Sequence, residues 1–239
     1  MALEELDLPN DLGRARDIDV IDRLISVAGL DIVDVGTFNG GLAKALAKRG
    51  ATVLGLEPDP VQAEKNKTAE MPEGVTLIEG RAEAMPCEDG SVDGVFFSKS
   101  LHHVPAEAMD MALRETARVL KPDGFAYFLE PDIRSPFSQM IKPVHDETVV
   151  RAQALAALSR TADRLFDDVD EYWYTITNVY PDFETFRQRL LGNTFNDHKA
   201  AAIDSDEIRT RFAAGAVDGE CRFDNLMRVR LYRRPRRAV

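Results

Sequence analysis

The glycine-rich turn around residue 36 constrains the fold more than any other part of the chain. Residues 32–35 are a short, mainly β-branched run, and Gly36, Gly40 and Gly41 follow within six residues. Residues 42–50 then place apolar side chains at helical spacing and end in a glycine. A strand, a glycine turn and a helix in this order form the first crossover of a doubly wound sheet. Ligands of such sheets bind beside this turn.

A second acidic position strengthens the prediction of a ligand site. Residues 52–56 are predicted to form the second strand, and Glu57 follows directly. A carboxylate at the tip of that strand can accept hydrogen bonds from both hydroxyls of a ribose. Asp59 and Pro60 then supply the N-cap and the first position of a helix. The turn alone fits any α/β protein, but the turn together with Glu57 predicts a ligand that carries a nucleoside.

The whole pattern predicts an α/β protein with a doubly wound, seven-stranded, mostly parallel sheet. Strands alternate with helices up to residue 130, which favours parallel strands joined by right-handed crossovers. The other strands predicted in this part are 75–78, 92–98 and 125–129.

The pattern changes after residue 130. Residues 133–170 contain no predicted strand and include an amphipathic helix. A sixth strand is predicted at 172–179, and the alternating stretch 226–232 is expected to close the sheet as an antiparallel last strand. We therefore expect an N-terminal helical leader, a ligand-binding core, a helical lid insert and a part that completes the same domain. Their predicted ranges are 1–31, 32–130, 131–171 and 172–239.

Composition argues against several functional classes. The chain has 30 basic and 41 acidic residues and a net charge of −11, which disfavours nucleic acid as a partner. Cys87 and Cys221 lie far apart and without zinc-type spacing, so we expect two free thiols, a cytoplasmic location and no metal site. Neither a signal peptide nor an apolar run of membrane-spanning length is visible, so no membrane partner is expected.

Arginine gathers at the C-terminal end of the chain. The simpler interpretation is a solvated edge strand and tail, and the alternative is that an acidic ligand or partner docks there. The residues are Arg228, Arg230, Arg233, Arg234, Arg236 and Arg237.

Several motifs, in the expected order, resemble the class I S-adenosylmethionine-dependent methyltransferases between about residues 32 and 128. The family's acid and Gly-x-Gly-x-Gly motif falls on Asp34, Gly36, Phe38 and Gly40, and its ribose acid falls on Glu57. The resemblance is greatest to the small-molecule branch, which includes the ubiquinone/menaquinone-biosynthesis and trans-aconitate methyltransferases.

Three further motifs extend this resemblance. The family's adenine loop corresponds to residues 81–83, its Leu-His-His-Val to residues 101–104, and its Arg-Val-Leu-Lys-Pro-Gly-Gly to residues 118–124. The resemblance implies a Rossmann-like methyltransferase fold and S-adenosylmethionine as cofactor, with S-adenosylhomocysteine as product. The cofactor-binding residues that it implies are Asp34, Gly36, Thr37, Phe38, Gly40, Glu57, Pro58, Arg81, Ala82, Glu83, Ser98 and Lys99.

Two positions depart from the family pattern. Phe38 replaces the middle glycine and would obstruct a dinucleotide pyrophosphate, which counts against a nicotinamide-dependent dehydrogenase. S-adenosylmethionine has no phosphate, so the turn tolerates Phe38 if the ring points away into the core. Arg81 replaces the acid that commonly meets the adenine amino group and cannot accept a hydrogen bond. A backbone carbonyl or Glu83 would have to serve instead.

Candidate catalytic residues lie where the fourth and fifth strands end. His103 is the first candidate for a general base or for orienting the acceptor, followed by His102 and by Glu130. The alternative for the histidines is a structural role in the loop near the cofactor.

The sequence thus predicts in-line methyl transfer to a small-molecule acceptor by a monomer or homodimer. The alternative is a catalytically silent S-adenosylmethionine-binding scaffold or regulatory protein, which would show tight cofactor binding without turnover and a filled acceptor cavity. A third hypothesis is an NAD-dependent oxidoreductase, but the sequence lacks the full set of glycines that such an enzyme requires.

Overall fold

The computed structural model describes residues 7–192 and 200–236. Its strands are β1 (Asp11–Arg14), β2 (Asp31–Val35), β3 (Thr52–Glu57), β4 (Val75–Glu79), β5 (Val92–Ser98), β6 (Leu120–Pro131), β7 (Phe166–Tyr180), β8 (Ala216–Val217) and β9 (Glu220–Pro235). Its α-helices are α1 (Asp17–Leu24), α2 (Gly41–Ala47), α3 (Pro60–Thr68), α4 (Met109–Val119), α5 (Pro136–Ile141), α6 (Thr148–Ala157), α7 (Asp163–Leu165), α8 (Phe183–Leu191), α9 (Ala200–Ile203) and α10 (Asp206–Ala213). A 3₁₀ turn, η2 (Leu101–His103), and a π-helical turn, η3 (Leu158–Ala162), complete the elements.

All strands belong to one sheet of order β1-β7-β9-β6-β5-β2-β3-β4, with β8 paired to β9 outside this path. The strands from β2 to β6 pair in parallel, so their carboxyl ends meet at one edge. The last strand, β9, runs antiparallel to both β6 and β7. The predicted mostly parallel α/β sheet with an antiparallel closing strand is therefore confirmed.

The sheet has nine strands, and the predicted number of seven is wrong. The two additional strands, β1 and β8, have four and two residues. Both are almost entirely exposed, so neither carries the alternation of apolar side chains that predicts a strand. β1 forms by pairing in parallel with β7, and β8 pairs with β9. Partners far along the chain create these strands.

The start of β7 is a second correction, because Phe166 to Asp170 lie in the stretch predicted to hold no strand. This part of the strand is acidic and pairs antiparallel with the end of β9, where arginines lie beside it. Arg234 lies 2.5 Å from Asp168, Arg236 lies 2.9 Å from Asp167, and Arg233 pairs with Asp170. The predicted solvated edge strand is wrong, because β9 lies between β7 and β6 in the sheet. Arg237 lies outside the described residues.

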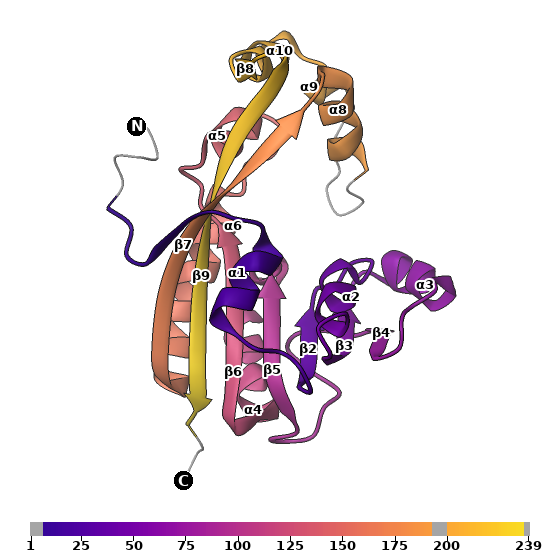
Figure 1. Ribbon diagram of the computed structural model, residues 1–239, viewed down its shortest axis with the longest axis vertical. Helices are drawn as coiled ribbons and strands as arrows, with labels where there is room; N and C mark the ends of the chain where they lie inside the picture. The colour runs from indigo at the N-terminus through magenta and orange to yellow at the C-terminus, as the bar shows by residue number, and fades with distance from the viewer. Residues whose placement is uncertain (1–6, 193–199, 237–239) are drawn as a thin grey trace.

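Three hydrophobic clusters hold the layers together. One joins the sheet to α4, α6 and η3, and another joins the opposite face to α1 and α2. The third joins α5, α8 and α10 to the last residues of β7 and the first residues of β9, which extend beyond the other strands (Figure 1). The helices of the predicted lid insert therefore belong to two different clusters: α5 is part of the third cluster, whereas α6 packs on the sheet in the first. Among the described residues, no helix is long and apolar enough to cross a bilayer.

Candidate functional site

A pocket of about 560 Å³, called the first pocket below, lies where β2, β3 and β5 end. Its size is typical of small-molecule sites. The lining residues are Val35, Gly36, Phe38, Glu57, Pro58, Gly80, Arg81, Ala82, Glu83, Ser98, Lys99, Ser100, His103, Val104 and Pro105. Nine of the twelve residues predicted to bind a cofactor are among them. They come from the glycine turn, the tip of β3, the loop after β4 and the end of β5.

The turn after β2 needs glycine at position 36. Gly36 has a φ of +72°, and a Cβ added there would lie 2.6 Å from Cβ of Ser100. Ser100 cannot easily move, because its hydroxyl donates a 2.6 Å hydrogen bond to the carbonyl of Val35. The amide of Gly36 donates to the carbonyl of Leu56 at 2.9 Å, which ties the turn to β3. The glycine thus lets the turn approach both neighbouring strands.

Glu57 is the most tightly fixed polar side chain in the wall of the first pocket. It is 1% exposed, and its carboxylate accepts hydrogen bonds from the amides of Phe38 at 2.8 Å and Asp59 at 2.9 Å. Burial raises the pKa of Glu57 above its ordinary value, whereas these two amides lower it. A carboxylate has about four acceptor positions, so the two amides leave others for ligand hydroxyls. Glu57 therefore has the position and the free acceptor capacity that a ribose requires.

Phe38 is part of the pocket wall, and the sequence leaves open whether its ring points away into the core. It is half-buried and has a φ of +52°, which is unusual for a residue with a side chain. Asn66 stabilises this backbone by donating a 2.6 Å hydrogen bond to the carbonyl of Phe38. Arg81, the other departure, also lines the pocket, with its side chain 68% exposed and 3.6 Å from Glu83.

Three of the predicted cofactor-binding residues, Asp34, Thr37 and Gly40, are not part of the pocket lining. Asp34 is 1% exposed and accepts a 2.7 Å hydrogen bond from the hydroxyl of Thr37. Burial raises the pKa of Asp34 to about 6. Gly40 has a φ of +77° and precedes the first residue of α2. These three residues lie near the end of β2 or within the turn between β2 and α2 and stabilise the conformation of that turn. Their contact with a ligand stays a prediction.

The two adjacent histidines of η2 have different surroundings. His103 lines the first pocket, whereas His102 is 4% exposed and lies between Glu130 and Glu147. Burial lowers the pKa of His102, but the charges and hydrogen bonds of the two carboxylates outweigh it and raise the pKa to about 9. His103 is an exposed residue, but the protein atoms that surround its ring and the nearby charge of His102 lower its pKa to about 4. At neutral pH, His102 is therefore an imidazolium and His103 a neutral imidazole.

Glu147 links this pair to the helix α6, and sequence reasoning missed it. Its carboxylate lies 3.4 Å from Nε2 of His102 and 3.0 Å from Nε2 of His145, and it also pairs with Arg151. These ion pairs hold the pKa of Glu147 well below its usual range, although burial opposes this. Nothing in the local sequence connects Glu147 with the site, because His102 lies far from it along the chain, although His145 and Arg151 are local partners.

His102, His103 and Glu147 also form a group whose nitrogen and oxygen atoms lie within 4.8 Å of one another, as metal ligands do. The guanidinium of Arg151 already pairs with Glu147, and Glu130 already occupies Nδ1 of His102. A positive charge on the carboxylate disfavours a divalent cation at the same place. We therefore propose no metal here, and the expected absence of a metal site stays a prediction.

A smaller cavity of about 300 Å³, called the second pocket below, lies between β6, β9 and α6. Its lining residues are Phe128, Glu130, Pro131, Asp132, Ile133, Arg134, Arg151, Ala152, Leu155, Leu158, Arg228 and Arg230. Glu130 thus lies in its wall, and its carboxylate contacts Nδ1 of His102. The ring of His102 is 4.1 Å from that of His103, measured between centroids. The three predicted catalytic residues therefore form a continuous chain from one pocket to the other.

Comparison with known proteins identifies the family of the core. Residues 33–128 match the methyltransferase domain family. The matched residues include the glycine turn, Glu57 and both histidines of η2. Only Phe128 of the second pocket falls inside this range.

Relatives and a solved structure agree with this assignment. An uncharacterized methyltransferase of Mycobacterium bovis is 36% identical over 107 residues, which cover 44% of this chain and 42% of that protein. A ubiquinone biosynthesis O-methyltransferase of Chromobacterium violaceum is 32% identical over 117 residues, which cover 46% of this chain and 48% of that protein. The similarity to these two relatives thus spans less than half of their length.

The fold is shared over nearly the whole chain with a candidate methyltransferase of Bacillus halodurans. The TM-score is 0.60, with 92% of this chain and 99% of that chain covered. The two sequences are 18% identical, so this likeness concerns the fold alone. It supports the predicted Rossmann-like fold of residues 33–128 and of the elements that follow them.

Proposed function

We propose that this protein transfers the methyl group of S-adenosylmethionine to a small-molecule acceptor. The observation that carries the proposal is the carboxylate of Glu57, which two backbone amides fix in the wall of a 560 Å³ pocket. A carboxylate at the tip of the second strand suits the two hydroxyls of the cofactor's ribose. Pro58, Ala82 and Val104 line the same pocket and offer apolar surface to an adenine ring. The residues present therefore fit the adenosyl part of the cofactor.

The bound cofactor supplies a methyl group that its sulfonium sulfur already activates. The residues of this chain therefore have to orient the acceptor and exclude water. Orientation alone contributes up to about 7–11 kcal/mol to such a reaction. The α6 helix, which begins directly after Glu147 and packs against η2, covers this side of the sheet together with α4 and η3.

His103 is the residue that we propose to face the acceptor. Its pKa of about 4 leaves the imidazole neutral, so it can accept a hydrogen bond from an acceptor hydroxyl or amine. The same low pKa makes it a weak base, because efficient general bases have a pKa near the working pH. We therefore assign it mainly to orientation. His102 and Glu130 form an ion pair with each other. We therefore assign both to positioning His103 rather than to contact with the acceptor.

The small size of the acceptor follows from the charge of the protein and from the second pocket. A net charge of −11 disfavours a polyanion, and a cavity of about 300 Å³ beside the histidines leaves room for a small molecule. The scaffold alternative was expected to have a filled acceptor cavity, and this second pocket argues against it. A cytoplasmic location and a monomeric or dimeric state remain predictions.

The deciding experiment is a calorimetric titration of the purified protein with S-adenosylmethionine, S-adenosylhomocysteine and NADH. We expect micromolar binding of both adenosyl-sulfur ligands and no binding of NADH. Absence of binding by the two sulfur ligands would remove the proposed cofactor and with it the proposed reaction.

A further inference from the structure

The second pocket gathers positive charge in a protein that is acidic overall. The net charge of the chain is −11. The charged residues of the lining are four arginines and two carboxylates, namely Arg134, Arg151, Arg228, Arg230, Glu130 and Asp132. An excess of guanidinium groups in a cavity, in a chain of opposite net charge, points to a negatively charged ligand.

The two carboxylates of the lining are already bound. Asp132 accepts hydrogen bonds from Nε of Arg134 at 2.8 Å and from its Nη2 at 3.0 Å. Glu130 accepts from the amide of Leu101 at 3.1 Å and contacts His102. Asp132 therefore mainly neutralises Arg134 and offsets the charge of Arg228 only in part, without a hydrogen bond to it. Arg151 and Arg230 pair with carboxylates outside the lining, namely Glu147, Glu171 and Asp163.

Arg228 is the least compensated of these arginines. Its Nε lies 3.8 Å from Glu171, beyond hydrogen-bond distance, and within the described residues this buried nitrogen has no hydrogen-bond partner. Glu171 already accepts from Nε1 of Trp173 at 3.1 Å and from Nε of Arg230 at 3.0 Å. Burial holds the pKa of Arg228 below its ordinary value, and the charges of Arg230 and Arg134 act in the same direction. A buried charge without a full partner is costly, and an anion would remove this cost.

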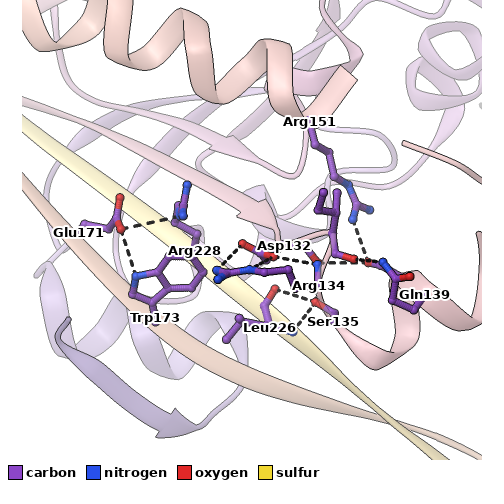
Figure 2. Close-up of polar contacts among 11 residues, drawn as sticks. Asp132, Arg134, Ser135, Gln139, Arg151, Glu171, Trp173, Leu226 and Arg228 are labelled. Atoms are coloured by element: carbon purple, nitrogen blue, oxygen red, sulfur yellow. Dashed lines mark hydrogen bonds and ion pairs between the residues drawn. The ribbon is translucent and has the colours of Figure 1, made fainter. Parts of the chain in front are cut away.

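Arg151 lines the same pocket from α6, and Figure 2 shows its side chain projecting from that helix. Its terminal nitrogens are bound, one to Glu147 and one to the hydroxyl of Ser138 at 2.9 Å. Its Nε is buried and, in the part of the chain that the structure describes, unpartnered like that of Arg228. Two arginines from opposite walls therefore each keep a buried donor without an acceptor. Arginine is well suited to planar carboxylates and to phosphates, because several of its donors lie in one plane.

The remaining walls of the second pocket are apolar. Phe128, Ile133, Leu155 and Leu158 surround the charged groups. These side chains suit the carbon skeleton of a ligand rather than a free inorganic ion.

We propose that the second pocket binds the carboxylate or phosphate group of an amphipathic acid, with Arg228 as the principal contact. That this acid is the methyl acceptor rests on the proposed function. The anion site itself rests only on the geometry of the arginines. The position of the pocket is consistent with an acceptor, because Glu130 in its wall connects through His102 to His103 in the first pocket.

Trp173 provides a reporter that does not depend on activity. It is the single tryptophan of the chain. Cζ of Arg228 lies 4.2 Å and Cζ of Arg134 5.5 Å from the centroid of its ring, as Figure 2 illustrates. An anion that draws these guanidinium groups away from the ring changes their cation–π contact with it and hence its fluorescence.

The test is a fluorescence titration of the full-length protein with hexanoate, hexyl phosphate and hexanamide. Hexanamide has the size of hexanoate without its charge. We expect a saturable change with at least one anion and at least tenfold weaker binding of hexanamide. The two anions distinguish a carboxylate from a phosphate ligand. Equal binding of hexanoate, hexyl phosphate and hexanamide, or binding of none of them, would overturn the proposal.

Three variants assign the contact. Arg228→Gln should weaken binding of the preferred anion at least tenfold, whereas Arg228→Lys, which keeps the charge, should retain part of the affinity. Arg222→Gln is the matched control, because Arg222 lies on the same strand, pairs with Glu220 at 3.7 Å and does not line the pocket. Unchanged affinity in Arg228→Gln would contradict the assignment. If that variant does not fold, the comparison of anion with amide in the natural protein still decides.

A parallel titration with S-adenosylhomocysteine separates this proposal from the proposed function. Anion binding without cofactor binding would remove the methyl-transfer reaction but leave the anion site. Cofactor binding without anion binding would overturn the anion site but leave the proposed methyl transfer standing.

Discussion

Nδ1 of His102 contacts the carboxylate of Glu130 in the interior of the protein, and this pair lies between the two pockets. On one side, the ring of His103 lies against His102 and faces the first pocket. On the other side, the carboxylate of Glu147, at the start of α6, lies 3.4 Å from Nε2 of His102 and also pairs with Arg151. One buried positive charge thus connects the first pocket with the second pocket.

This buried charge predicts a specific dependence of stability on pH. The folded-state pKa of His102 is raised from 6.5 to about 9, so the folded protein keeps a proton that the unfolded chain loses. The stabilisation is fully present below pH 6.5 and is lost as the pH rises through about 9. We expect the free energy of unfolding in urea to fall over this range in the natural protein and to fall less in His102→Gln. Parallel slopes for the two proteins would show that His102 is neutral in the folded state.

His103 is expected to affect transfer and not cofactor binding. His103→Ala removes the neutral imidazole that we propose to orient the acceptor, so the transfer rate should fall by about 10²–10⁴-fold at most. Calorimetry should give an affinity for S-adenosylhomocysteine within twofold of the natural value. The rate is to be measured with an acceptor found among amphipathic acids. Full activity of the variant would assign His103 to structure alone.

Glu57 is expected to dominate cofactor affinity. Glu57→Gln removes the charge and one acceptor oxygen, so the affinity for S-adenosylhomocysteine should fall at least tenfold, or about 1.4 kcal/mol. Asp59→Asn is the matched control, because it changes the next carboxylate along the chain but keeps the amide that binds Glu57 and a side chain able to cap α3. It should bind within twofold of the natural protein. Equal losses of affinity in the two variants would indicate that the affinity depends on the negative charge of this region rather than on a contact between Glu57 and the ribose.

Two glycines allow the steric role of the turn to be separated from its backbone conformation. Gly36 and Gly29 have φ values of +72° and +77°, but only at Gly36 would a Cβ meet another residue, at 2.6 Å from Ser100. Gly29→Ala should cost about 1–2 kcal/mol, which is the usual cost of the left-handed conformation. Gly36→Ala should cost clearly more and also weaken binding of S-adenosylhomocysteine. Urea unfolding of both variants measures the difference, and equal losses would mean that the turn yields to the added carbon.

The glycine turn and Glu57 could be predicted because their signals are local. Each depends on a strand, a turn and a helix that follow one another directly, so residues 32–60 carry the whole pattern. The roles of Glu147 and Arg151 could not be predicted in this way, because α6 gives only an amphipathic pattern. The short strand β1 was missed because its sequence has no strand pattern and only its pairing with the distant strand β7 makes it a strand. Residues whose partners lie far away in the sequence therefore account for most of what the structure adds.

Phe38 offers the sharpest test of how the turn differs from its family. Its φ of +52° costs free energy for any residue with a Cβ, and it lines the first pocket. Phe38→Gly removes both the strain and the ring, whereas Phe38→Ala removes the ring but keeps the strain. We expect Phe38→Gly to bind S-adenosylhomocysteine as well as or better than the natural protein, and Phe38→Ala to be less stable than Phe38→Gly in urea. A large loss of affinity in both variants would instead show that the ring itself contacts the ligand, which would make the departure from the glycine motif a binding feature of this protein.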